Sequence, residues 1–467
     1  MRARDGIGTA VTGEALSETT PKRFFIETFG CQMNVNDSEK VAGLLRADGL
    51  EPAASVEEAD TVFINTCAVR EKAAEKLFHS VGRLRRLRRT KPHLTIGVGG
   101  CVPQLLGESI LERAPEIDLL VGPHNVASVP GLLARAGRGE HHLVDLDRKA
   151  DRFAVPADVV AHSNPFRAYV TVMEGCNHVC SFCVVPRTRG PEVCRPAEEI
   201  LAEVESLVAR GVPEVMLLGQ TVNAYRHGGV DFARLLEIVG SVPGLRRLRF
   251  TTSHPAHVTA ALADVLSRVD SICPYLHLPV QSGSDRLLDA MRRGYSVREY
   301  RDKVALLRAR VPSLALSSDV ICGYPTETLE DFEATVDLVQ EVGFEGLFVF
   351  AYSPRPGTTA VREVDDVADK EKKRRVHVLN DIQQQLQAER NRRRLGRIEN
   401  VLVESWDQDG RLAGRTPDFR MVHFEGPREW LGRCVGVRIE SSGPNSLSGR
   451  TVPANDSLTV GSAVPIF

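Results

Sequence analysis

The repeated strand-and-helix pattern of residues 166–360 is the feature that most limits the folds open to this chain. A short apolar segment followed by a helical segment recurs about six times in this region. The apolar segments are AYVTVM, EVMLLG, RLRFTT, YLHLPV, ALSSDVI and GLFVFAY. Strands that alternate with helices form parallel sheets whose faces the helices cover. Six such units predict an incomplete (βα)6 barrel, with functional groups on the loops that follow the carboxyl ends of the strands.

The flanking regions predict an α/β protein of three domains. In residues 23–140, FFIETF, TVFINT, LTIGVGG and IDLLVG are expected to be strands of a parallel sheet in an N-terminal α/β domain. Residues 1–22 are expected to be a flexible extension, and residues 141–165 a linker. A long charged helix is expected over residues 368–397, so the central domain spans 166–397. Short strand-like segments after it predict a small β-barrel over residues 398–467.

Composition excludes several classes of protein. The chain has 467 residues, with 59 Lys and Arg against 61 Asp and Glu and a formal net charge of −2. Binding of nucleic acid must therefore depend on local patches and not on a global basic field. No apolar run reaches the length of a membrane span, and the N-terminal segment lacks the apolar core of a signal peptide. These features predict a protein of the cytoplasm that does not bind membranes.

Three cysteines follow the first strand of the predicted barrel directly. Cys176, Cys180 and Cys183 have the spacing C-x3-C-x2-C, within MEGCNHVCSFCVVPRTRG. A structural zinc site needs a fourth ligand, and neither His178 nor Cys194 forms a second well-spaced pair with these residues. Packing alone would be a poor use of three thiols at one strand end. An iron–sulfur cluster, which thiolates hold, accounts better for the spacing, and three thiolates leave one iron of a four-iron cluster open.

A second set of three cysteines lies in the N-terminal region. Cys31, Cys67 and Cys101 each end one of the three apolar strands FFIETF, TVFINT and LTIGVGG. The carboxyl ends of parallel strands meet at one edge of a sheet, where ligands bind. These residues are therefore expected to converge and hold a second cluster. The alternative is three unrelated cysteines at strand ends.

The two sets of cysteines, in this order of domains, resemble those of the radical S-adenosylmethionine methylthiotransferases. The segments that carry the resemblance are FGCQMNVNDSE, NTCAVREKA, GCNHVCSFCVVPRTRG, LLGQTVNAY, HLPVQSGSD and SPRPGT. Gln32, Met33 and Asn34 after Cys31 are similar to the branch that acts on isopentenylated tRNA. The ribosomal-protein branch typically has Pro-Lys there, and the threonylcarbamoyl-adenosine branch Lys-Val. The chain departs from the family at Thr326, where Gly is common, and at Cys194, where Ser is usual.

The resemblance implies an activity, cofactors and partners. The enzyme would convert N(6)-isopentenyladenosine at position 37 of tRNA, next to the anticodon, to its 2-methylthio derivative. It would hold two [4Fe-4S] clusters and use S-adenosylmethionine both as methyl donor and as radical source. A reductant such as flavodoxin or ferredoxin is implied, the protein is expected to be a monomer, and the C-terminal barrel resembles a TRAM domain, an RNA-binding module.

Polar residues after the barrel strands, and one aromatic residue in the cysteine loop, are candidates to bind S-adenosylmethionine. The alternative for the polar residues is ordinary turn capping. The candidates are Phe182, Gln220, Asn223, Gln281, Ser282, Ser318 and Asp319.

Basic residues leave two interpretations open. Arg187, Arg189 and Arg195 flank the cysteine loop, where they either bind tRNA phosphate or pair with carboxylates and fix the loop. The runs RLRRLRR (83–89) and RNRRRLGR (390–397) are either solvated helix faces or phosphate contacts. Two rival classes of function also remain open, namely a sister methylthiotransferase and a non-catalytic electron carrier or RNA-binding protein.

Overall fold

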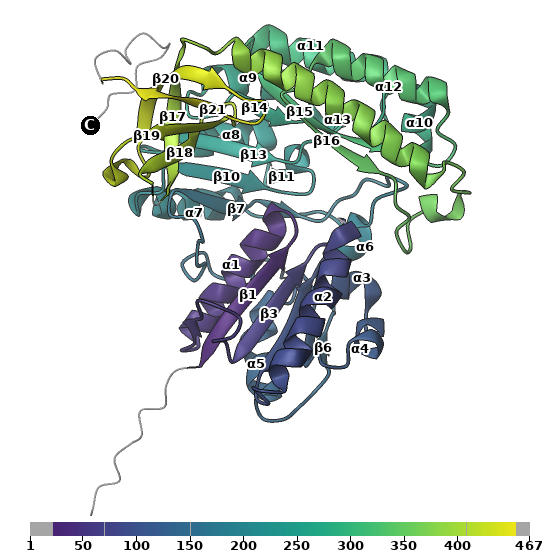
Figure 1. Ribbon diagram of the computed structural model, residues 1–467, viewed down its shortest axis with the longest axis vertical. Coiled ribbons are helices and arrows are strands. Elements are labelled where there is room, and N and C mark those ends of the chain that lie inside the picture. Colours follow the sequence, from purple (N-terminus) through teal and green to yellow (C-terminus); the bar gives the residue numbers. More distant parts are fainter. Residues whose placement is uncertain (1–21, 70, 150, 408, 454–467) are drawn as a thin grey trace, which may run out of the picture.

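The protein folds into an N-terminal α/β domain, a central half-open barrel and a small C-terminal β-barrel (Figure 1). The computed structural model describes residues 22–453 except 70, 150 and 408. Apart from Lys22, the predicted N-terminal extension lies outside the described residues, as do residues 454–467 of the predicted C-terminal domain. The architecture predicted from the sequence, an α/β protein with a parallel sheet, an incomplete barrel and a small β-barrel, is confirmed.

The N-terminal domain is built on a six-stranded parallel sheet in the order β2-β1-β3-β4-β5-β6. Alternate side chains of the central strands pack into two separate cores, with Val62 and Ile64 on one face and Phe63 on the other. This two-sided burial is why the strands read as continuous apolar runs. The elements are β1 (Arg23–Phe29), α1 (Gln32–Ala47), β2 (Glu51–Pro52), β3 (Thr61–Thr66), α2 (Glu71–Arg88), β4 (Thr95–Gly100), α3 (Cys101–Leu106), α4 (Ser109–Arg113), β5 (Leu119–Val121), α5 (Val129–Ala136) and β6 (Leu143–Asp145).

The segment predicted as a linker has a structural role in the N-terminal domain. Its first part contains β6, which adds the sixth strand to the sheet beside β5. Its last part packs on α1, where the Glu39 carboxylate accepts hydrogen bonds from the backbone nitrogen and the hydroxyl of Ser163, at 2.8 and 2.6 Å. Gly43 allows this close approach, because a Cβ there would lie 1.8 Å from the carbonyl oxygen of Val159.

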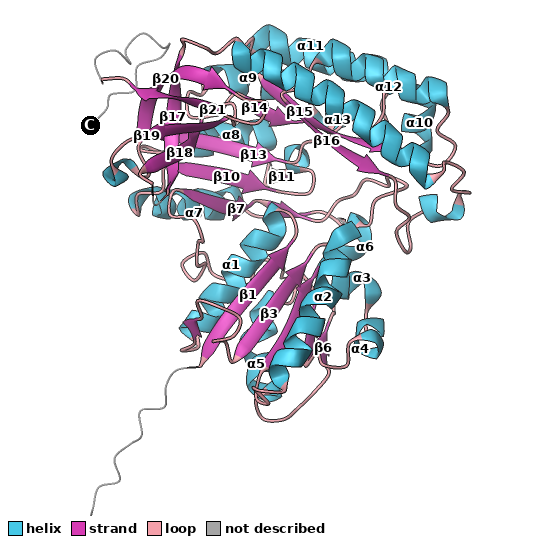
Figure 2. Ribbon diagram, in the orientation of Figure 1, coloured by secondary structure: helices cyan, strands magenta, loops and turns pink. Residues whose placement is uncertain are grey.

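The central barrel consists of two three-stranded parallel sheets, β13-β10-β7 and β14-β15-β16. Backbone hydrogen bonds join them, since Leu248 donates to Ser271 and accepts from Cys273. Helices cover the outer face, as Figure 2 shows, and the large apolar core lies between helices and strands. The strands are β7 (Arg167–Thr171), β10 (Glu214–Leu218), β13 (Arg247–Thr251), β14 (Tyr275–His277), β15 (Ala315–Cys322) and β16 (Gly346–Ala351). The helices are α6 (Val185–Thr188), α7 (Ala197–Ala209), α8 (Phe232–Gly240), α9 (Ala260–Arg268), α10 (Asp285–Ala290), α11 (Val297–Arg310), α12 (Leu329–Val342) and α13 (Asp369–Arg392).

The C-terminal domain is a closed barrel in the order β17-β18-β19-β21-β20. Its strands are β17 (Ile398–Trp406), β18 (Arg411–Arg415), β19 (Met421–Glu425), β20 (Cys434–Ser442) and β21 (Leu447–Thr451). Short two-residue pairs complete the strand inventory at β8 (Met173–Glu174) with β9 (Val193–Cys194) and at β11 (Arg226–His227) with β12 (Val230–Asp231).

A buried arginine fastens the C-terminal barrel to the central one. Arg249 on β13 donates to the carbonyl oxygens of Thr416 and Pro417, at 3.0 and 2.7 Å, and pairs with Glu214 at 2.9 Å. Its guanidinium also lies over the ring of Phe419, 4.6 Å from the centroid.

Among the described residues, no helix combines the length and apolarity that a membrane crossing needs.

Candidate functional site

The strand register brings the three N-terminal cysteines to one edge of the sheet. Phe29, Thr66 and Gly100, the last residues of β1, β3 and β4, are aligned with one another across the sheet. Cys67 and Cys101 directly follow two of these residues, and Cys31 lies two residues beyond Phe29 as the N-cap of α1. The predicted convergence therefore follows from aligned parallel strands that all end at the same level.

Two asparagines fix the loops that carry these cysteines. The Asn34 amide donates to Asn65 Oδ1 at 3.1 Å, and the Asn65 amide donates to the carbonyl oxygen of Asn34 at 2.9 Å. Asn34 Oδ1 also accepts from the thiol of Cys31 at 3.3 Å. Gly100 has φ +96°, and a Cβ there would lie 2.4 Å from Asn65 Oδ1. The glycine thus leaves room for the asparagine pair between the strand ends.

The thiols of this edge influence one another. A side-chain hydrogen bond from Cys67 lowers the pKa of Cys31 to about 6, and the same contact raises the pKa of Cys67. Burial raises the pKa of Cys101, and the positive charge of the Arg189 guanidinium opposes the rise. One thiolate is therefore favoured before any metal binds, which suits a site that takes up iron.

Each cysteine of the barrel loop has its own hydrogen-bond partner. Cys176 contacts the hydroxyl of Thr221 at 3.2 Å, and Cys183 accepts from the backbone nitrogen of Val185 at 3.5 Å. The guanidinium of Arg293 donates to Cys180 at 3.4 Å. Burial raises the pKa of Cys176 and raises that of Cys183 to about 12. The sulfurs are thus held in place by donors that would stabilise them as thiolates.

The donors at each site, three thiols, suit an iron–sulfur cluster better than a single ion. Within the described part of the chain, neither set of three cysteines brings its sulfurs to within 4.8 Å of one another, the separation expected of ligands on one ion. A four-iron cluster is wider than one ion and takes thiolate ligands. The residues present therefore fit a cluster at each site, whereas a tetrahedral zinc site through His178 or Cys194 is not supported.

The two cysteine sites face each other across the interface of the two α/β domains. In Figure 1 the strands of the N-terminal sheet run toward the barrel with their carboxyl ends. Cys31 and Met33 pack against Met216 and Leu218 of β10. Arg189, on the barrel side, forms ion pairs with Asp37 of α1 and with Glu174, and all three side chains are at most 3% exposed. The interface is thus closed and specifically paired, with both sets of thiols beside it.

The predicted cofactor residues fall into two groups by their contacts. Four are engaged with the backbone of neighbouring loops. Gln220 accepts from the Gly175 nitrogen at 2.5 Å, Asn223 forms a reciprocal pair with the His254 backbone at 2.8 and 2.9 Å, and Ser318 accepts from the Val280 nitrogen at 2.9 Å. Ser282 accepts from the Ser284 nitrogen at 3.2 Å. These contacts hold loops at the strand ends, and a role in cofactor binding stays a prediction for all four.

The other three predicted residues have different surroundings. Gln281 has φ +77°, and its backbone bridges to β15 through Asp319 and Ile321. The Asp319 carboxylate lies 3.5 Å from Nε2 of His277 and is 26% exposed. Phe182 packs partly buried beside Tyr324 and Tyr352. Their cofactor contacts also stay predictions.

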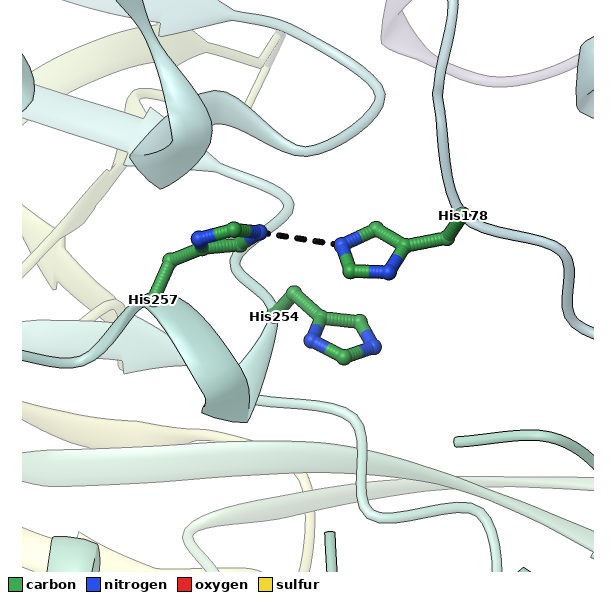
Figure 3. A group of neighbouring side chains, drawn as sticks. All are labelled: His178, His254 and His257. Atoms are coloured by element: carbon green, nitrogen blue, oxygen red, sulfur yellow. Dashed lines mark hydrogen bonds between the residues drawn. The ribbon is translucent and has the colours of Figure 1, made fainter. Parts of the chain in front are cut away.

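Three histidines that the sequence did not group together lie beside one another at the cysteine loop, and one of them, His178, belongs to that loop (Figure 3). His178, His254 and His257 bring ring nitrogens within 4.8 Å of one another, as metal ligands do. However, Nδ1 of His254 accepts from the Ala256 nitrogen, which puts the proton of the neutral ring on Nε2. The rings of His178 and His254 are also stacked, 3.9 Å apart and 16° from parallel, so their in-plane lone pairs do not meet. We therefore interpret this group as packing beside the loop.

Two exposed aromatic residues face the inside of the barrel, and the sequence pattern gave no sign of their role. On β16, Leu347 and Val349 pack toward the helix layer, so Phe348 and Phe350 point the opposite way. Their exposed fractions are 53% and 44%, high for strand phenylalanines. They lie opposite Asp319 and Ile321 of β15. The barrel therefore has an apolar, aromatic wall beside an acidic group.

The arginines around the cysteine loop divide between the two predicted roles. Arg189 and Arg195 pair with carboxylates, Arg195 with Glu203 at 2.6 Å. Arg187 is exposed, and no ion pair to it is found among the described residues.

Both basic runs are largely paired as well, for example Arg83 with Glu27 at 2.6 Å. Of the four cysteines outside the two sets, Cys273 and Cys322 are buried, and Cys194 and Cys434 are partly buried.

Comparison with known proteins gives matches along most of the chain. Residues 23–122 match the model described as Uncharacterized protein family UPF0004, residues 170–339 the Radical SAM superfamily, and residues 392–452 the TRAM domain. The chain is 46% identical over 446 residues to the tRNA-2-methylthio-N(6)-dimethylallyladenosine synthase of Thiobacillus denitrificans, covering 92% of this chain and 98% of that protein. The synthase of Haemophilus influenzae is 44% identical over 449 residues, covering 94% of each chain.

The chain belongs to this synthase family. It is therefore a radical S-adenosylmethionine enzyme that transfers a sulfur group, as the family resemblance of the two sets of cysteines implied. An iron–sulfur cluster and S-adenosylmethionine are its cofactors. Among solved structures, the radical S-adenosylmethionine methyltransferase TsrM of Kitasatospora setae has a TM-score of 0.53 at 15% identity, covering 73% of this chain and 77% of that one. That likeness concerns the fold alone.

Proposed function

We propose that this enzyme converts N(6)-isopentenyladenosine at position 37 of tRNA to its 2-methylthio derivative, using two [4Fe-4S] clusters. The name of the relatives, which describes a tRNA 2-methylthio-dimethylallyladenosine synthase, supports the substrate. The observation that carries the two-cluster reading is the pair of three-cysteine sites beside one closed interface. If only the barrel cysteines held a cluster, the protein would have no second metal centre to carry the sulfur group that is transferred.

We assign the clusters to the two sets of thiolates. Cys176, Cys180 and Cys183 would hold the cluster that binds S-adenosylmethionine, and Cys31, Cys67 and Cys101 the cluster that carries sulfur. When bound, the first cluster and S-adenosylmethionine supply a deoxyadenosyl radical for removal of hydrogen from carbon 2 of the adenine. The cofactor supplies this chemistry, and the protein supplies position and shielding.

The chain's own residues would hold the target base between the two sites. Phe348 and Phe350 offer exposed rings inside the barrel, and base–aromatic stacking is worth about 1–3 kcal/mol per base. The Asp319 carboxylate is partly exposed beside them and can accept from a ribose hydroxyl. Met216 and Leu218, next to Cys31, form an apolar surface that helps to exclude water.

Reconstitution tests this proposal directly. Full-length protein is loaded anaerobically with iron and sulfide and given isopentenylated tRNA, and the nucleosides are analysed by mass. We expect Cys31→Ala to release deoxyadenosine without forming the methylthio product, and Cys176→Ala to form neither. Cys194→Ser is the matched control, because it changes a cysteine outside both sets. Normal product from Cys31→Ala would overturn the two-cluster proposal.

The same assay separates the rival functions. Threonylcarbamoylated tRNA is tested in parallel, and its methylthiolation in place of the isopentenylated substrate would indicate the sister activity. A non-catalytic carrier would release no deoxyadenosine.

Other properties belong to the same proposal. We propose a monomer in the cytoplasm, reduced by flavodoxin or ferredoxin. The domain bounds predicted from the sequence, 23–140, 166–397 and 398–467, are kept, except that β6 (Leu143–Asp145) extends the N-terminal domain beyond residue 140. Phe182, Gln220, Asn223, Gln281, Ser282, Ser318 and Asp319 are proposed to lie around S-adenosylmethionine.

A further inference from the structure

The two cysteine sites are built on a common pattern of donors. In each, one cysteine accepts from the backbone nitrogen two residues further on, namely Cys67 from Val69 at 3.3 Å and Cys183 from Val185 at 3.5 Å. A buried arginine also acts on one cysteine of each site. Arg293 donates to Cys180 at 3.4 Å, whereas Arg189 acts on Cys101 through its charge. Of these two arginines, it is Arg293 that donates a hydrogen bond to sulfur.

The charge of Arg293 has no carboxylate to balance it. The residue is 6% exposed, and its other nitrogens donate to the carbonyl oxygen of Pro279 and to the hydroxyl of Tyr295, both at 3.1 Å. Among the described ion pairs, none involves Arg293. A buried charge is costly unless an opposite charge lies near it. The anion that fits here is the thiolate of Cys180 together with the iron–sulfur cluster that it would hold.

Arg189 has a different electrostatic environment. Asp37 and Glu174 both pair with it, and each retains one buried oxygen that has no hydrogen-bond partner. Two carboxylates thus already balance one guanidinium. Arg189 and its two carboxylates together therefore present no net positive charge to the N-terminal thiols.

We propose that Arg293 is a positioning residue that raises the reduction potential of the barrel cluster. This inference rests on the proposed two clusters. Reduction adds an electron to an anionic centre, so a nearby positive charge and a hydrogen bond to sulfur both favour the reduced state. The N-terminal site lacks such an uncompensated charge, because Asp37 and Glu174 accompany Arg189.

Redox titration of the full-length holoenzyme, followed by electron paramagnetic resonance, measures both potentials. Addition of S-adenosylmethionine changes the signal of the cluster with the open iron that it binds, which assigns the two signals. Full-length variants that lack one set of three cysteines check this assignment. Two cluster signals in the unmodified enzyme establish that the premise holds. Only one signal would overturn the proposed function and not the role of Arg293.

Arg293→Met is expected to lower the potential of the barrel cluster alone. At a fixed potential, the ratio of reduced to oxidised cluster should fall at least tenfold, which equals about 59 mV for one electron. Arg293→Lys keeps the charge and should recover most of the loss. The potential of the N-terminal cluster should stay unchanged in both variants, which makes this cluster the internal control.

Several outcomes would overturn the inference. Unchanged potentials in fully loaded Arg293→Met protein would do so, as would a shift of both clusters together. If Arg293→Met does not keep its cluster, Arg293→Gln is compared with Arg293→Lys, and the neutral side chain must give the lower potential. Loss of the cluster in all three variants would mean that Arg293 serves assembly and not potential.

Discussion

Asn34 and Asn65 each donate a hydrogen bond to the other, and these two bonds connect the loop of Cys31 to the end of the neighbouring strand β3. Each donates from its amide to the other, one to a side-chain oxygen and one to a carbonyl oxygen. Both side chains are almost fully buried, at 0% and 1% exposure. The geometry of the N-terminal cysteines therefore depends on two residues that ligate nothing.

Asn65→Ala is expected to weaken the N-terminal site. It removes the bonds to Asn34 and a 3.0 Å bond to Ser38, and leaves buried groups unpaired at a cost of about 2–4 kcal/mol. Urea unfolding should show this loss, and the iron content after reconstitution should fall toward half. Asn445→Ala, at an exposed position, should change neither quantity. Full iron loading of Asn65→Ala would contradict the role given to this pair.

Thr326→Gly is expected to stabilise the protein slightly. Thr326 has φ +70°, a left-handed conformation that costs non-glycine residues roughly 1–2 kcal/mol. Part of the gain is offset by the greater freedom of glycine in the unfolded chain, and by the lost 3.1 Å bond from Arg286 to the threonine hydroxyl. We expect a net gain of about 0.5 kcal/mol in the free energy of unfolding. The control is Thr328→Gly, which removes the N-cap of α12 at ordinary φ and should destabilise by a few tenths of a kcal/mol or more.

Phe348→Ala is expected to weaken binding of tRNA without affecting the cysteine loop. The loss of one stacking ring should raise KM for tRNA about tenfold or more. Release of deoxyadenosine in the absence of tRNA should stay unchanged, because the ring of Phe348 packs edge-on against His277 of β14 and, among the described residues, makes no ring contact with the cysteine loop. Val364→Ala, which also truncates an exposed apolar side chain, is the control. An unchanged KM for both Phe348→Ala and Phe350→Ala would remove these residues from the base-binding role.

Stability is expected to fall as the pH drops from 6.5 to about 4. Burial lowers the pKa of His124 from 6.5 to about 4, with Arg152 and Arg189 adding to the effect. The unfolded chain therefore binds a proton across this window before the folded chain does, so acid favours unfolding by at most about 3 kcal/mol.

His124→Gln should flatten this dependence. The glutamine can still donate to the Arg189 carbonyl oxygen that His124 contacts at 3.1 Å. Urea unfolding of metal-free protein at pH 7 and pH 5 gives the two slopes, with the exposed His79→Gln as control. Equal slopes for His124→Gln and the unmodified protein would show that another group is responsible.

The sequence predicted those parts of the fold that depend on local periodicity. The buried strands of both α/β domains were predicted close to their observed ends, because parallel strands covered on both faces leave continuous apolar runs. The strand β6 was missed, since LVD is only three residues long and lies within the segment predicted as a linker.

The convergence of the N-terminal cysteines could be predicted from the sequence, but the residues that contact the two sets of cysteines could not. Cys31, Cys67 and Cys101 end successive strands, and topology alone brings such residues together. Arg293 reaches Cys180 across more than a hundred residues of chain, and no spacing rule predicts that contact. For Arg189, the sequence left phosphate binding and carboxylate pairing equally open, and only the position of Asp37 decides between them.

The guanidinium that the barrel contributes to the N-terminal thiols has a practical consequence for dividing the chain. A fragment that ends before the barrel would retain all three N-terminal cysteines but lose Arg189, and with it the partner of Asp37. The remaining piece would expose Met216 and Leu218 to water. Neither fragment would therefore reproduce the metal chemistry of its half of the enzyme, and studies of one cluster in isolation should keep the whole polypeptide and remove ligands instead.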